Sequence, residues 1–375
     1  MEICIDYQPA VSQCAGIGRY TRMLASEIAE LLSDEDKLRL HYCDFRRNAK
    51  VDNIPNAEFV PFRLVPGAVL QRLWRRVGFP PYDALAGRAD LFHFTNFITY
   101  PVRRGKSVVT IHDMSFERFP EFTEEKNLNN LKKGIRNTVH RADSIITISE
   151  FSRTEIEQII PESKGKTHVT HLGISDYFRR ASKEEIAGVK KELGIARPFI
   201  MTVGTVEPRK NLGFLVDVFE GLVDSGMDID LVVSGARGWK CEAIFEKFAN
   251  TKYHDRLHYM GFVPDGKLHA LYSAADLFVT TSFYEGFGFP PLEAMACGTP
   301  VLSSAGGSLP EVLGDAATVV SSFDVKEWVH EAKRIFEDTL LKSGMVERGK
   351  KRAEQFRWSN TAKATLDIYR KTLNG

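Results

Sequence analysis

The sequence predicts an α/β protein made of two doubly wound, Rossmann-like domains. Short apolar runs rich in β-branched residues alternate with longer amphipathic stretches, a pattern typical of parallel strands joined by helices that cover both faces of a sheet. This alternation runs through the first half of the chain and starts again in the second half. A chain of 375 residues also exceeds the size of one ordinary core, so two domains are expected.

The first half contains the elements expected of the first domain. Its strand candidates are short runs dominated by Val, Ile, Leu and Phe, and its helix candidates carry apolar residues at helical spacing. The expected strands span 2–6, 38–43, 91–94, 107–111, 144–148 and 168–172, and the expected helices span 18–32, 126–142 and 150–160.

The second half repeats the same alternation. The polar segment 175–185 is the predicted linker and hinge, so the first domain is expected at 1–175 and the second at 176–357. The expected strands of the second domain span 199–203, 231–235, 257–260, 277–281, 300–304 and 317–320, and its expected helices span 211–225, 265–275, 290–297 and 324–338.

Composition excludes several classes of protein. A net charge of +1 provides no general attraction for nucleic acid, so no nucleic-acid partner is expected. The five cysteines are scattered without a C-x-x-C pair or a Cys/His cluster, so neither a zinc site nor a disulfide framework is indicated. The first residues carry acids and no long apolar run, and no stretch reaches the ~20 apolar residues that cross a bilayer. These observations predict a cytoplasmic protein.

Ligands of open parallel sheets bind beyond the carboxyl ends of the strands, so the residues that follow each strand are the candidates for function. Gly16 and Gly18 follow the first strand, but the third glycine of a dinucleotide fingerprint is replaced by Thr21. The two glycines allow close approach of a phosphate or sugar to the backbone, and a plain tight turn is the alternative. His112 and Asp113 follow the strand at 107–111, where a histidine is either functional or simply structural.

Two further strand ends carry charged residues. Gly204 and Thr205 follow the strand at 199–203, and Arg209 and Lys210 come four and five residues after Thr205. An Arg-Lys pair on a strand-to-helix turn suits a diphosphate, although an exposed basic turn has the same pattern. We expect Lys210 to be exposed and to contribute little to stability.

The stretch FYEGFGFPPLEAMACGTPV, residues 283–301, sets two carboxylates around a glycine-rich turn. Pro290 and Pro291 fit the first turn of a helix, whose N-terminus favours a phosphate. Glu293, expected in that first turn, either stabilises the helix dipole or accepts hydrogen bonds from a vicinal diol such as ribose. Glu285 on the loop suits the hydroxyls of a sugar ring. Two carboxylates that bind two diols, with a phosphate between them, describe a nucleotide-sugar site.

Glu285 and Glu293 form an E-x7-E motif, and the sequence around them resembles retaining glycosyltransferases of the GT-B fold, in the glycosyl transferases group 1 family (family 4). The resemblance covers most of the chain and is weakest over residues 45–90. Within the family, the sequence most resembles bacterial mannosyltransferases of polysaccharide and lipopolysaccharide biosynthesis. The resemblance implies two Rossmann-like domains facing a cleft, with a C-terminal helix at 358–373 that crosses back to the first domain. The motifs that carry it are SFYEGFGFPPLEAMACGTPVLSSAGGSLPEVLGDAA (282–317), VGTVEPRKNL (203–212), GFVPDGKLHALYSAAD (261–276), TIHDMSF (110–116), ISEFSR (148–153) and FRWSNTAKATLDIYRK (356–371).

The resemblance implies a role for each matching position. Glu293 would bind the donor ribose, Glu285 would hold the donor sugar, and Arg209 and Lys210 would neutralise the diphosphate. His112 would face the donor sugar and the reacting bond, so the implied catalytic set is His112, Arg209, Lys210 and Glu285. The implied donor-binding set is Gly16, Gly18, Gly204, Thr205, Val263, Gly286, Phe287, Gly288, Leu292 and Glu293, and the implied acceptor-side residues are Asp113 and Ser149.

One position departs from the family pattern. Many members carry an arginine where this chain has Thr205, about six residues from the lysine, whereas here Arg209 and Lys210 are adjacent. We interpret Arg209 as the replacement.

The resemblance predicts a retaining, metal-independent hexosyltransferase whose donor is a nucleotide sugar, GDP-mannose being favoured over UDP-glucose or UDP-GlcNAc. No cofactor or metal is expected, because the D-x-D sequence Asp228-Ile229-Asp230 precedes a strand instead of following one and suits a solvated strand start. The alternatives are a non-catalytic nucleotide-sugar-binding protein and an epimerase or phosphorylase on a related scaffold.

A membrane contact is expected in the first domain, because a lipid-linked saccharide is a plausible acceptor. Residues 45–106 hold eleven Lys or Arg against four Asp or Glu. Within this region, 68–79 places apolar residues at helical spacing opposite Arg72, Arg75 and Arg76, which suits an interfacial helix on anionic lipid. The alternative is an ordinary helix that buries its apolar side against the first sheet.

Overall fold

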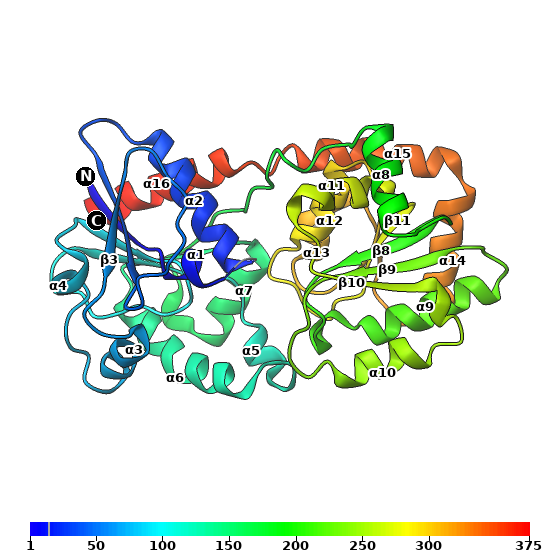
Figure 1. The fold of residues 1–375 in the computed structure, drawn as a ribbon. Coiled ribbons are helices and arrows are strands. Elements are labelled where there is room, and N and C mark those ends of the chain that lie inside the picture. The colour runs from blue at the N-terminus through cyan, green and yellow to red at the C-terminus, as the bar shows by residue number, and fades with distance from the viewer. Residues whose placement is uncertain (14–15) are drawn as a thin grey trace. The chain divides into compact units, whose positions relative to one another are not determined.

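The computed structural model describes residues 1–13 and 16–375, and these form two compact units (Figure 1). The first unit contains Met1–Arg118, Glu125–Gly173 and Arg357–Gly375. The second unit contains Ile174–Phe356 together with the short segment Phe119–Glu124. The division therefore falls at Gly173, two residues before the linker expected from sequence, and the short segment 119–124 departs from the predicted domain 1–175.

The first unit is built on a seven-stranded parallel sheet with the order β3-β2-β1-β4-β5-β6-β7. Its strands are β1 (Glu2–Asp6), β2 (Lys37–Cys43), β3 (Ala57–Phe62), β4 (Leu91–Phe94), β5 (Lys106–Thr110), β6 (Ser144–Thr147) and β7 (Thr167–Val169). Its helices are α1 (Gln8–Ser12), α2 (Ile17–Leu31), α3 (Gly67–Arg76), α4 (Asp83–Ala86), α5 (Ser115–Arg118), α6 (Glu125–Arg141), α7 (Glu150–Ile159) and α16 (Trp358–Asn374), with the 3-10 turn η2 (Pro161–Ser163).

The C-terminal helix α16 returns to the first unit, as the resemblance implied. The Tyr369 hydroxyl of this helix lies 2.5 Å from His93 Nδ1 on β4, and Thr372 Oγ1 lies 2.8 Å from Ser144 Oγ on β6. Both tyrosine and histidine are fully buried, so these polar contacts fix where the helix packs on the sheet.

The second unit is built on a six-stranded parallel sheet with the order β10-β9-β8-β11-β12-β13. Its strands are β8 (Phe199–Val203), β9 (Asp230–Ser234), β10 (Leu257–Gly261), β11 (Leu277–Thr280), β12 (Val301–Ser304) and β13 (Thr318–Val320). Its helices are α8 (Lys183–Glu192), α9 (Leu212–Asp224), α10 (Glu242–Asn250), α11 (Asp265–Ala274), α12 (Phe289–Ala296), α13 (Leu309–Leu313), α14 (Val325–Glu337) and α15 (Thr339–Ala353), with the 3-10 turns η1 (Pro120–Phe122), η3 (Pro208–Lys210), η4 (His254–Arg256) and η5 (Gly314–Ala316).

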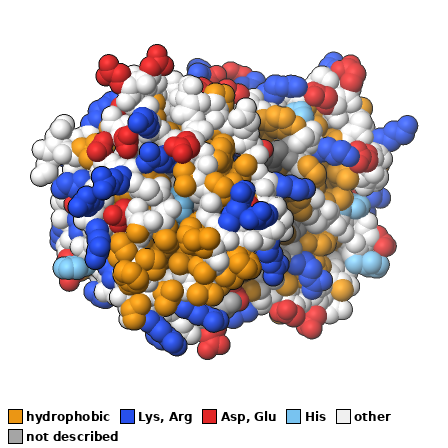
Figure 2. Space-filling model, turned by 60° about the vertical axis from the view of Figure 1, so that its left-hand side comes forward, with side chains coloured by type: hydrophobic (Ala, Val, Ile, Leu, Met, Phe, Trp, Pro, Cys, Tyr) orange, Lys and Arg blue, Asp and Glu red, His pale blue; other side chains and the backbone are white. Residues whose placement is uncertain are grey.

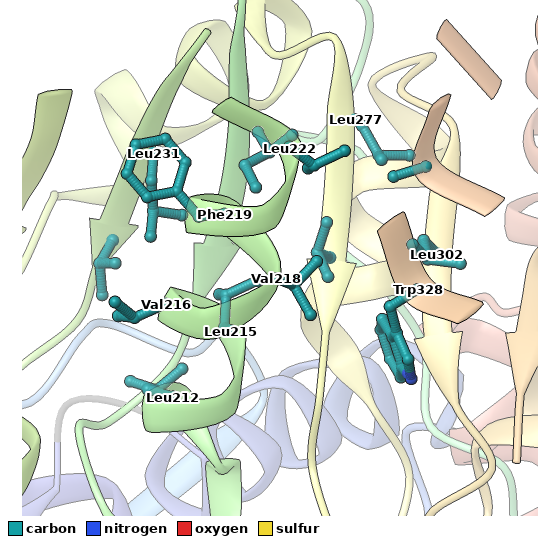
Figure 3. Close-up of a cluster of buried hydrophobic side chains, with 14 of the residues drawn as sticks. Leu212, Leu215, Val216, Val218, Phe219, Leu222, Leu231, Leu277, Leu302 and Trp328 are labelled. Carbon is teal, nitrogen blue, oxygen red and sulfur yellow. The ribbon is translucent and has the colours of Figure 1, made fainter. Parts of the chain in front are cut away.

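The core of the second unit shows why its sheet is covered by helices. Helix α9 buries Leu215, Val218 and Leu222 at helical spacing, and these side chains pack toward Leu277 of β11 (Figure 3). Trp328 of α14 fills the same cluster and is fully buried. Each buried aliphatic side chain contributes roughly 1.5–3 kcal/mol by leaving water, so this apolar layer holds the carboxyl ends of β8 and β11 in place.

All twelve predicted strands are present, and the predicted doubly wound α/β fold is confirmed. Strand β3 was not predicted; it contains Pro61, and its side chains are exposed or only partly buried. It forms the edge of the sheet, where a proline that donates no hydrogen bond is tolerated. The helices that were not predicted are α1, α4, α5, α8, α10, α13 and α15.

The segment predicted as the linker and hinge, 175–185, makes several contacts within the second unit. Phe178 is buried against Tyr272, and the Ala181 amide donates to Ser273 Oγ at 3.0 Å. Ser182 then caps α8 in a capping box with Glu185, so a helix begins inside the segment 175–185. A segment tied down at this many points is an anchor, and the chain changes units before it, at Gly173.

Gly18 is needed for steric reasons, and this leads to a stability prediction. A Cβ at Gly18, in the first turn of α2, would lie 2.0 Å from the backbone oxygen of Gln13. We expect Gly18→Ala to lower the free energy of unfolding by more than about 1 kcal/mol. Gly188 in α8 meets no atom within 4 Å, so Gly188→Ala should stabilise by about 0.5–1 kcal/mol. Thermal melts of both variants test the pair, and equal effects would contradict the steric explanation.

Candidate active site

The strand order of the second unit marks the place for a ligand. Strands β8 and β11 are neighbours in the sheet but are separated in the chain by β9 and β10, so the order reverses between them. Ligands of open parallel sheets bind beyond the carboxyl ends of the strands at this reversal. The loop after β8 carries Gly204 to Lys210, and the loop after β11 carries Glu285 to Gly288, so both loops flank this position.

A buried cluster of opposite charges joins these two loops. The Glu285 carboxylate accepts hydrogen bonds from Lys210 Nζ at 2.5 Å and from Arg209 Nη1 at 2.9 Å. Ser282 Oγ donates to the same carboxylate at 2.6 Å. The side chain of Glu285 is only 11% exposed, and those of Lys210 and Arg209 are 15% and 20% exposed. The three residues chosen from sequence therefore form one ion-pair network, and Lys210 is not the exposed turn residue that we expected.

The network keeps Glu285 ionised. Burial opposes the charged carboxylate, but the positive charges of Lys210 and Arg209, with hydrogen bonds from Lys210 and Ser282, together outweigh it and lower its pKa to about 2. A carboxyl with so low a pKa accepts hydrogen bonds and does not act as a proton donor near neutral pH. Glu285 is thus suited to hold cations or hydroxyls in place.

Glu207 is a member of the cluster that the sequence analysis missed. Arg209 Nη2 donates to Glu207 Oε1 at 2.6 Å, so its guanidinium spans Glu207 and Glu285. Glu207 is 2% exposed, and its second oxygen has no hydrogen-bond partner in the part of the chain that the structure describes. Its position in VGTVEPRKNL, two residues before Arg209, is the signal that could have found it.

The cluster is balanced in charge, with two cations and two carboxylates. A donor diphosphate would therefore meet Arg209 and Lys210 already paired and would have to share them with Glu207 and Glu285. Lys210 also packs beside Gly204, where a Cβ would lie 3.2 Å from its Cε. Gly204 has a φ of +154°, and Thr205 after it is half-buried.

The glycine-rich turn after β11 brings backbone close to backbone. A Cβ at Gly307 would lie 2.3 Å from the backbone carbonyl oxygen of Glu285, and the Ser308 amide donates to the same carbonyl oxygen at 2.9 Å. Gly288 has a φ of +101° and forms the N-cap of α12. Gly286 and Phe287 complete the turn, and Phe287 is buried.

Helix α12 begins at Phe289, one residue before the predicted start, so Pro290 and Pro291 lie inside its first turn. Glu293 consequently lies in the second turn, and the expectation that it sits in the first turn is wrong. Its side chain is buried and accepts a hydrogen bond from the Tyr272 hydroxyl at 2.9 Å. Dipole stabilisation at the helix end does not explain a carboxylate in this environment.

The other predicted donor residues of the second unit lie near these loops or in the core. Leu292 of α12 is fully buried, so its side chain packs in the core. Val263 is half-buried in the connection between β10 and α11. The Asp228 and Asp230 pair lies at the start of β9, the opposite end from the ligand-binding loops, where both residues pair with Arg197. Asp230 is buried there, so it is not the solvated residue that we expected.

The predicted residues of the first unit are described separately. His112 is buried, and its Nε2 atom lies 2.9 Å from the Thr95 carbonyl oxygen. Burial lowers the pKa of this imidazole. Asp113 Oδ1 accepts the Ser115 amide at 2.9 Å at the start of α5. Ser149 caps α7 by accepting the Ser152 amide at 3.1 Å. Gly16, with a φ of +57°, caps α2.

These two sheets and their loops define a two-domain glycosyltransferase of the GT-B class, and comparison with known proteins supports this conclusion. The family described as Glycosyl transferases group 1 matches residues 187–352, and Glycosyltransferase Family 4 matches 15–176. An O-antigen chain mannosyltransferase B from Escherichia coli is 32% identical over 99% of this chain and 100% of its own length. The chain therefore belongs to the family 4, group 1 glycosyltransferases.

Two solved structures share the fold. Sucrose-phosphate synthase from Thermosynechococcus elongatus matches with a TM-score of 0.78 and 19% identity, covering 99% of this chain and 98% of that one. HepE from Anabaena, solved in complex with UDP-glucose, matches with a TM-score of 0.72 and 20% identity, covering 99% of each chain. At these identities the comparison supports the fold and not the substrate.

The buried position of Lys210 leads to a stability prediction that reverses our expectation from sequence. Lys210→Ala removes a charged hydrogen bond from a part-buried carboxylate and should lower the free energy of unfolding by about 2 kcal/mol. Lys247 pairs with Asp217 at the surface of the same unit, so Lys247→Ala should cost less than about 1 kcal/mol. Melting curves of the two variants should therefore differ, and a parent-like melt for Lys210→Ala would contradict the ion-pair network.

Proposed function

We propose that this glycosyltransferase moves mannose from GDP-mannose to a saccharide or lipid-linked saccharide acceptor, with retention of anomeric configuration, in cell-surface polysaccharide biosynthesis. The family membership supports the reaction class, and the full-length similarity to a mannosyltransferase supports the sugar. The observation that carries the proposal is the site itself. Two buried carboxylates, Glu285 and Glu293, lie on the loop and helix that flank the strand reversal, where a nucleotide sugar has two diols to bind.

The chemistry follows from where charge develops. Cleavage of the sugar-nucleotide bond builds negative charge on the leaving diphosphate and positive charge on the sugar ring. Lys210, Arg209 and the positive N-terminal end of the α12 dipole would stabilise the negative charge on the diphosphate, which is electrostatic stabilisation of the transition state. The ionised Glu285 is held by both cations, so it suits donor hydroxyls better than nucleophilic attack. We therefore infer a front-face attack in which a diphosphate oxygen accepts the proton of the acceptor hydroxyl.

The donor base and sugar separate this proposal from its main alternative, a UDP-sugar such as UDP-glucose or UDP-GlcNAc. A solved structure of the same fold, HepE, is bound to UDP-glucose, so the fold accommodates a UDP-sugar. We favour GDP-mannose on the similarity to the E. coli mannosyltransferase. We also propose that the reaction needs no resident metal or cofactor, because Arg209 and Lys210 supply cationic groups at the donor loops.

A polar cavity in the first unit suits the acceptor. It has a volume of about 820 Å³ and opens beyond the carboxyl ends of β1 and β2. Amide, carboxylate and basic side chains line it, which together donate to and accept from saccharide hydroxyls. The lining includes Gln8, Gln13, Arg22, Asp44, Asn48 and Lys50.

A patch on α3, next to this cavity, suits a membrane surface. Pro66 and Gly67, where α3 begins, line the cavity. Helix α3 buries Leu70 and Trp74, as the ordinary-helix alternative required, but other apolar side chains along it stay exposed. We define the α3 patch as the exposed residues Leu64, Val69, Leu73, Val77 and Phe79 together with Arg72, Arg75 and Arg76.

Apolar side chains gather on the face shown in Figure 2, with basic side chains around them. In the part of the chain that the structure describes, no helix is both long and apolar enough to cross a bilayer. An apolar patch with arginines around it is typical of a surface that lies on anionic headgroups, so we propose peripheral binding through the α3 patch.

A donor assay tests the proposed function. Purified protein should release GDP from GDP-mannose faster when a polysaccharide-derived acceptor is present, and it should release little UDP from UDP-glucose. Glu293→Gln should weaken donor binding by a factor on the order of 10 to 100, because the buried carboxylate loses a charged acceptor worth about 1.5–3 kcal/mol. Glu285→Ala should depress turnover. Isothermal titration and a coupled nucleotide-release assay measure both effects, and parent-like transfer by both variants would show that the donor site lies elsewhere.

Vesicle co-sedimentation tests the membrane surface. The parent should bind vesicles that contain phosphatidylglycerol and ignore pure phosphatidylcholine. Changing Arg72, Arg75 and Arg76 to Gln should weaken binding by about 3 kcal/mol, or a factor on the order of 100, at about 1 kcal/mol per basic residue. The matched control changes the exposed residues Lys326, Lys351 and Lys363 to Gln, which removes equal charge from α14, α15 and α16. Equal losses in both variants would mean that net charge, and not the α3 patch, governs binding.

A further inference from the structure

A short segment of the chain, Phe119–Glu124, belongs to the second unit although the residues on both sides of it belong to the first. We call this segment the strap. It contains the 3-10 turn η1, Pro120–Phe122, and follows α5 directly. A chain that leaves one unit for six residues and then returns must be held by specific contacts, because the ordering of each residue costs about 1–2 kcal/mol of backbone entropy.

The loop after β9 holds the backbone of the strap. Trp239 Nε1 donates to the Phe122 carbonyl oxygen at 2.5 Å. Lys240 Nζ donates to the carbonyl oxygens of Glu121 at 2.6 Å and Thr123 at 3.2 Å. Lys240 has a φ of +52°, a left-handed conformation that is uncommon for a residue with a long side chain. The loop therefore accepts local strain in the place where it reaches the strap.

The loop after β11 holds the aromatic side chains of the strap. The Phe122 ring stacks on Phe283 with centroids 5.4 Å apart and an interplanar angle of 21°. The Phe119 ring meets Tyr284 edge-on at 5.9 Å and stacks on Phe122 at 5.5 Å. Phe283 and Tyr284 immediately precede Glu285, so the strap packs against the residues that lead into the charge cluster.

Arg209 also contacts these two residues. The Phe283 amide donates to the Arg209 carbonyl oxygen at 2.9 Å, and Arg209 Nη1 donates to the Tyr284 carbonyl oxygen at 2.6 Å. The backbone before Glu285 is thus hydrogen-bonded to Arg209, which also binds the Glu285 carboxylate, while the side chains of Phe283 and Tyr284 contact the aromatic rings of the strap.

We propose that the strap is a positioning element of the donor site: residues 119–124, held by Trp239 and Lys240, fix the Phe283–Tyr284 backbone so that Glu285 keeps its geometry toward the donor sugar. Trp239, Lys240 and Phe122 are then positioning residues, because they act through Glu285 and do not touch the reacting atoms. The catalytic consequence rests on the proposed role of Glu285. The structural consequence, an immobilised 283–288 loop, does not.

The first variant removes the side-chain hydrogen bonds to the strap and leaves the sequence of the strap intact. Trp239→Phe combined with Lys240→Met eliminates the three side-chain hydrogen bonds to the strap backbone. We expect amide hydrogen exchange of residues 283–288 to accelerate, and kcat for sugar transfer to fall about tenfold, a loss of about 1.4 kcal/mol in transition-state stabilisation. Affinity for GDP alone should change less than twofold, because Glu293 and Tyr272 are untouched. Phe122→Ala, which removes the stacked ring, should give the same pattern.

A matched pair in the same unit supplies the control. Lys252 and Tyr253 are also an adjacent Lys and aromatic residue, and they donate to Asp224 at 2.6 Å and 2.7 Å. Lys252→Met combined with Tyr253→Phe should leave both kcat and the exchange of 283–288 at parent values. Parent-like exchange in the strap variant overturns the proposal, as does an unchanged kcat or an equal loss in the control. If the parent protein itself transfers no sugar, the proposed function fails, and the exchange measurement alone decides the role of the strap.

Discussion

The structure of the candidate donor site depends on the burial of one ionised carboxylate. A buried charge costs several kcal/mol unless it is paired and hydrogen-bonded, and Glu285 meets this requirement with Lys210, Arg209 and Ser282. These partners come from two loops that must approach closely, because the ion pairs span 75 and 76 residues of sequence. The charge cluster therefore determines how the loops after β8 and β11 are placed, and the E-x7-E turn has its observed shape for the same reason.

Close approach of neighbouring loops explains two glycines beyond the strand ends of the second unit. A Cβ at Gly235 would lie 1.8 Å from the backbone carbonyl oxygen of Gly204, and a Cβ at Gly306 would lie 2.3 Å from the backbone carbonyl oxygen of Ser282. Backbone thus packs directly against backbone beyond the strand ends, where any side chain would push the loops apart. These two glycines let the loop after β9 approach the loop after β8, and the loop after β12 approach the loop after β11.

The two units combine rigid sheets with functional loops in the same way. In each unit the sheet reverses its strand order once, between β1 and β4 in the first unit and between β8 and β11 in the second. Arg209 and Lys210 follow β8, next to the reversal, whereas His112 and Asp113 follow β5, one strand beyond it. Buried helices such as α9 and α16 hold the strands. The candidate residues lie on loops, so the contacts of those loops decide the geometry of the site.

The sequence by itself determined the two parallel sheets, most of the helices that cover them and the family. Alternating apolar runs and the E-x7-E motif are local patterns, so they can be recognised without knowing which residues are in contact. The tertiary structure alone decided the rest. It paired Arg209 with both Glu207 and Glu285, buried Lys210, placed Glu293 beside Tyr272, anchored the segment 175–185 and assigned residues 119–124 to the second unit. Each of these features depends on contacts between residues distant in sequence, and a local sequence pattern does not reveal which distant residues meet or how strongly they interact.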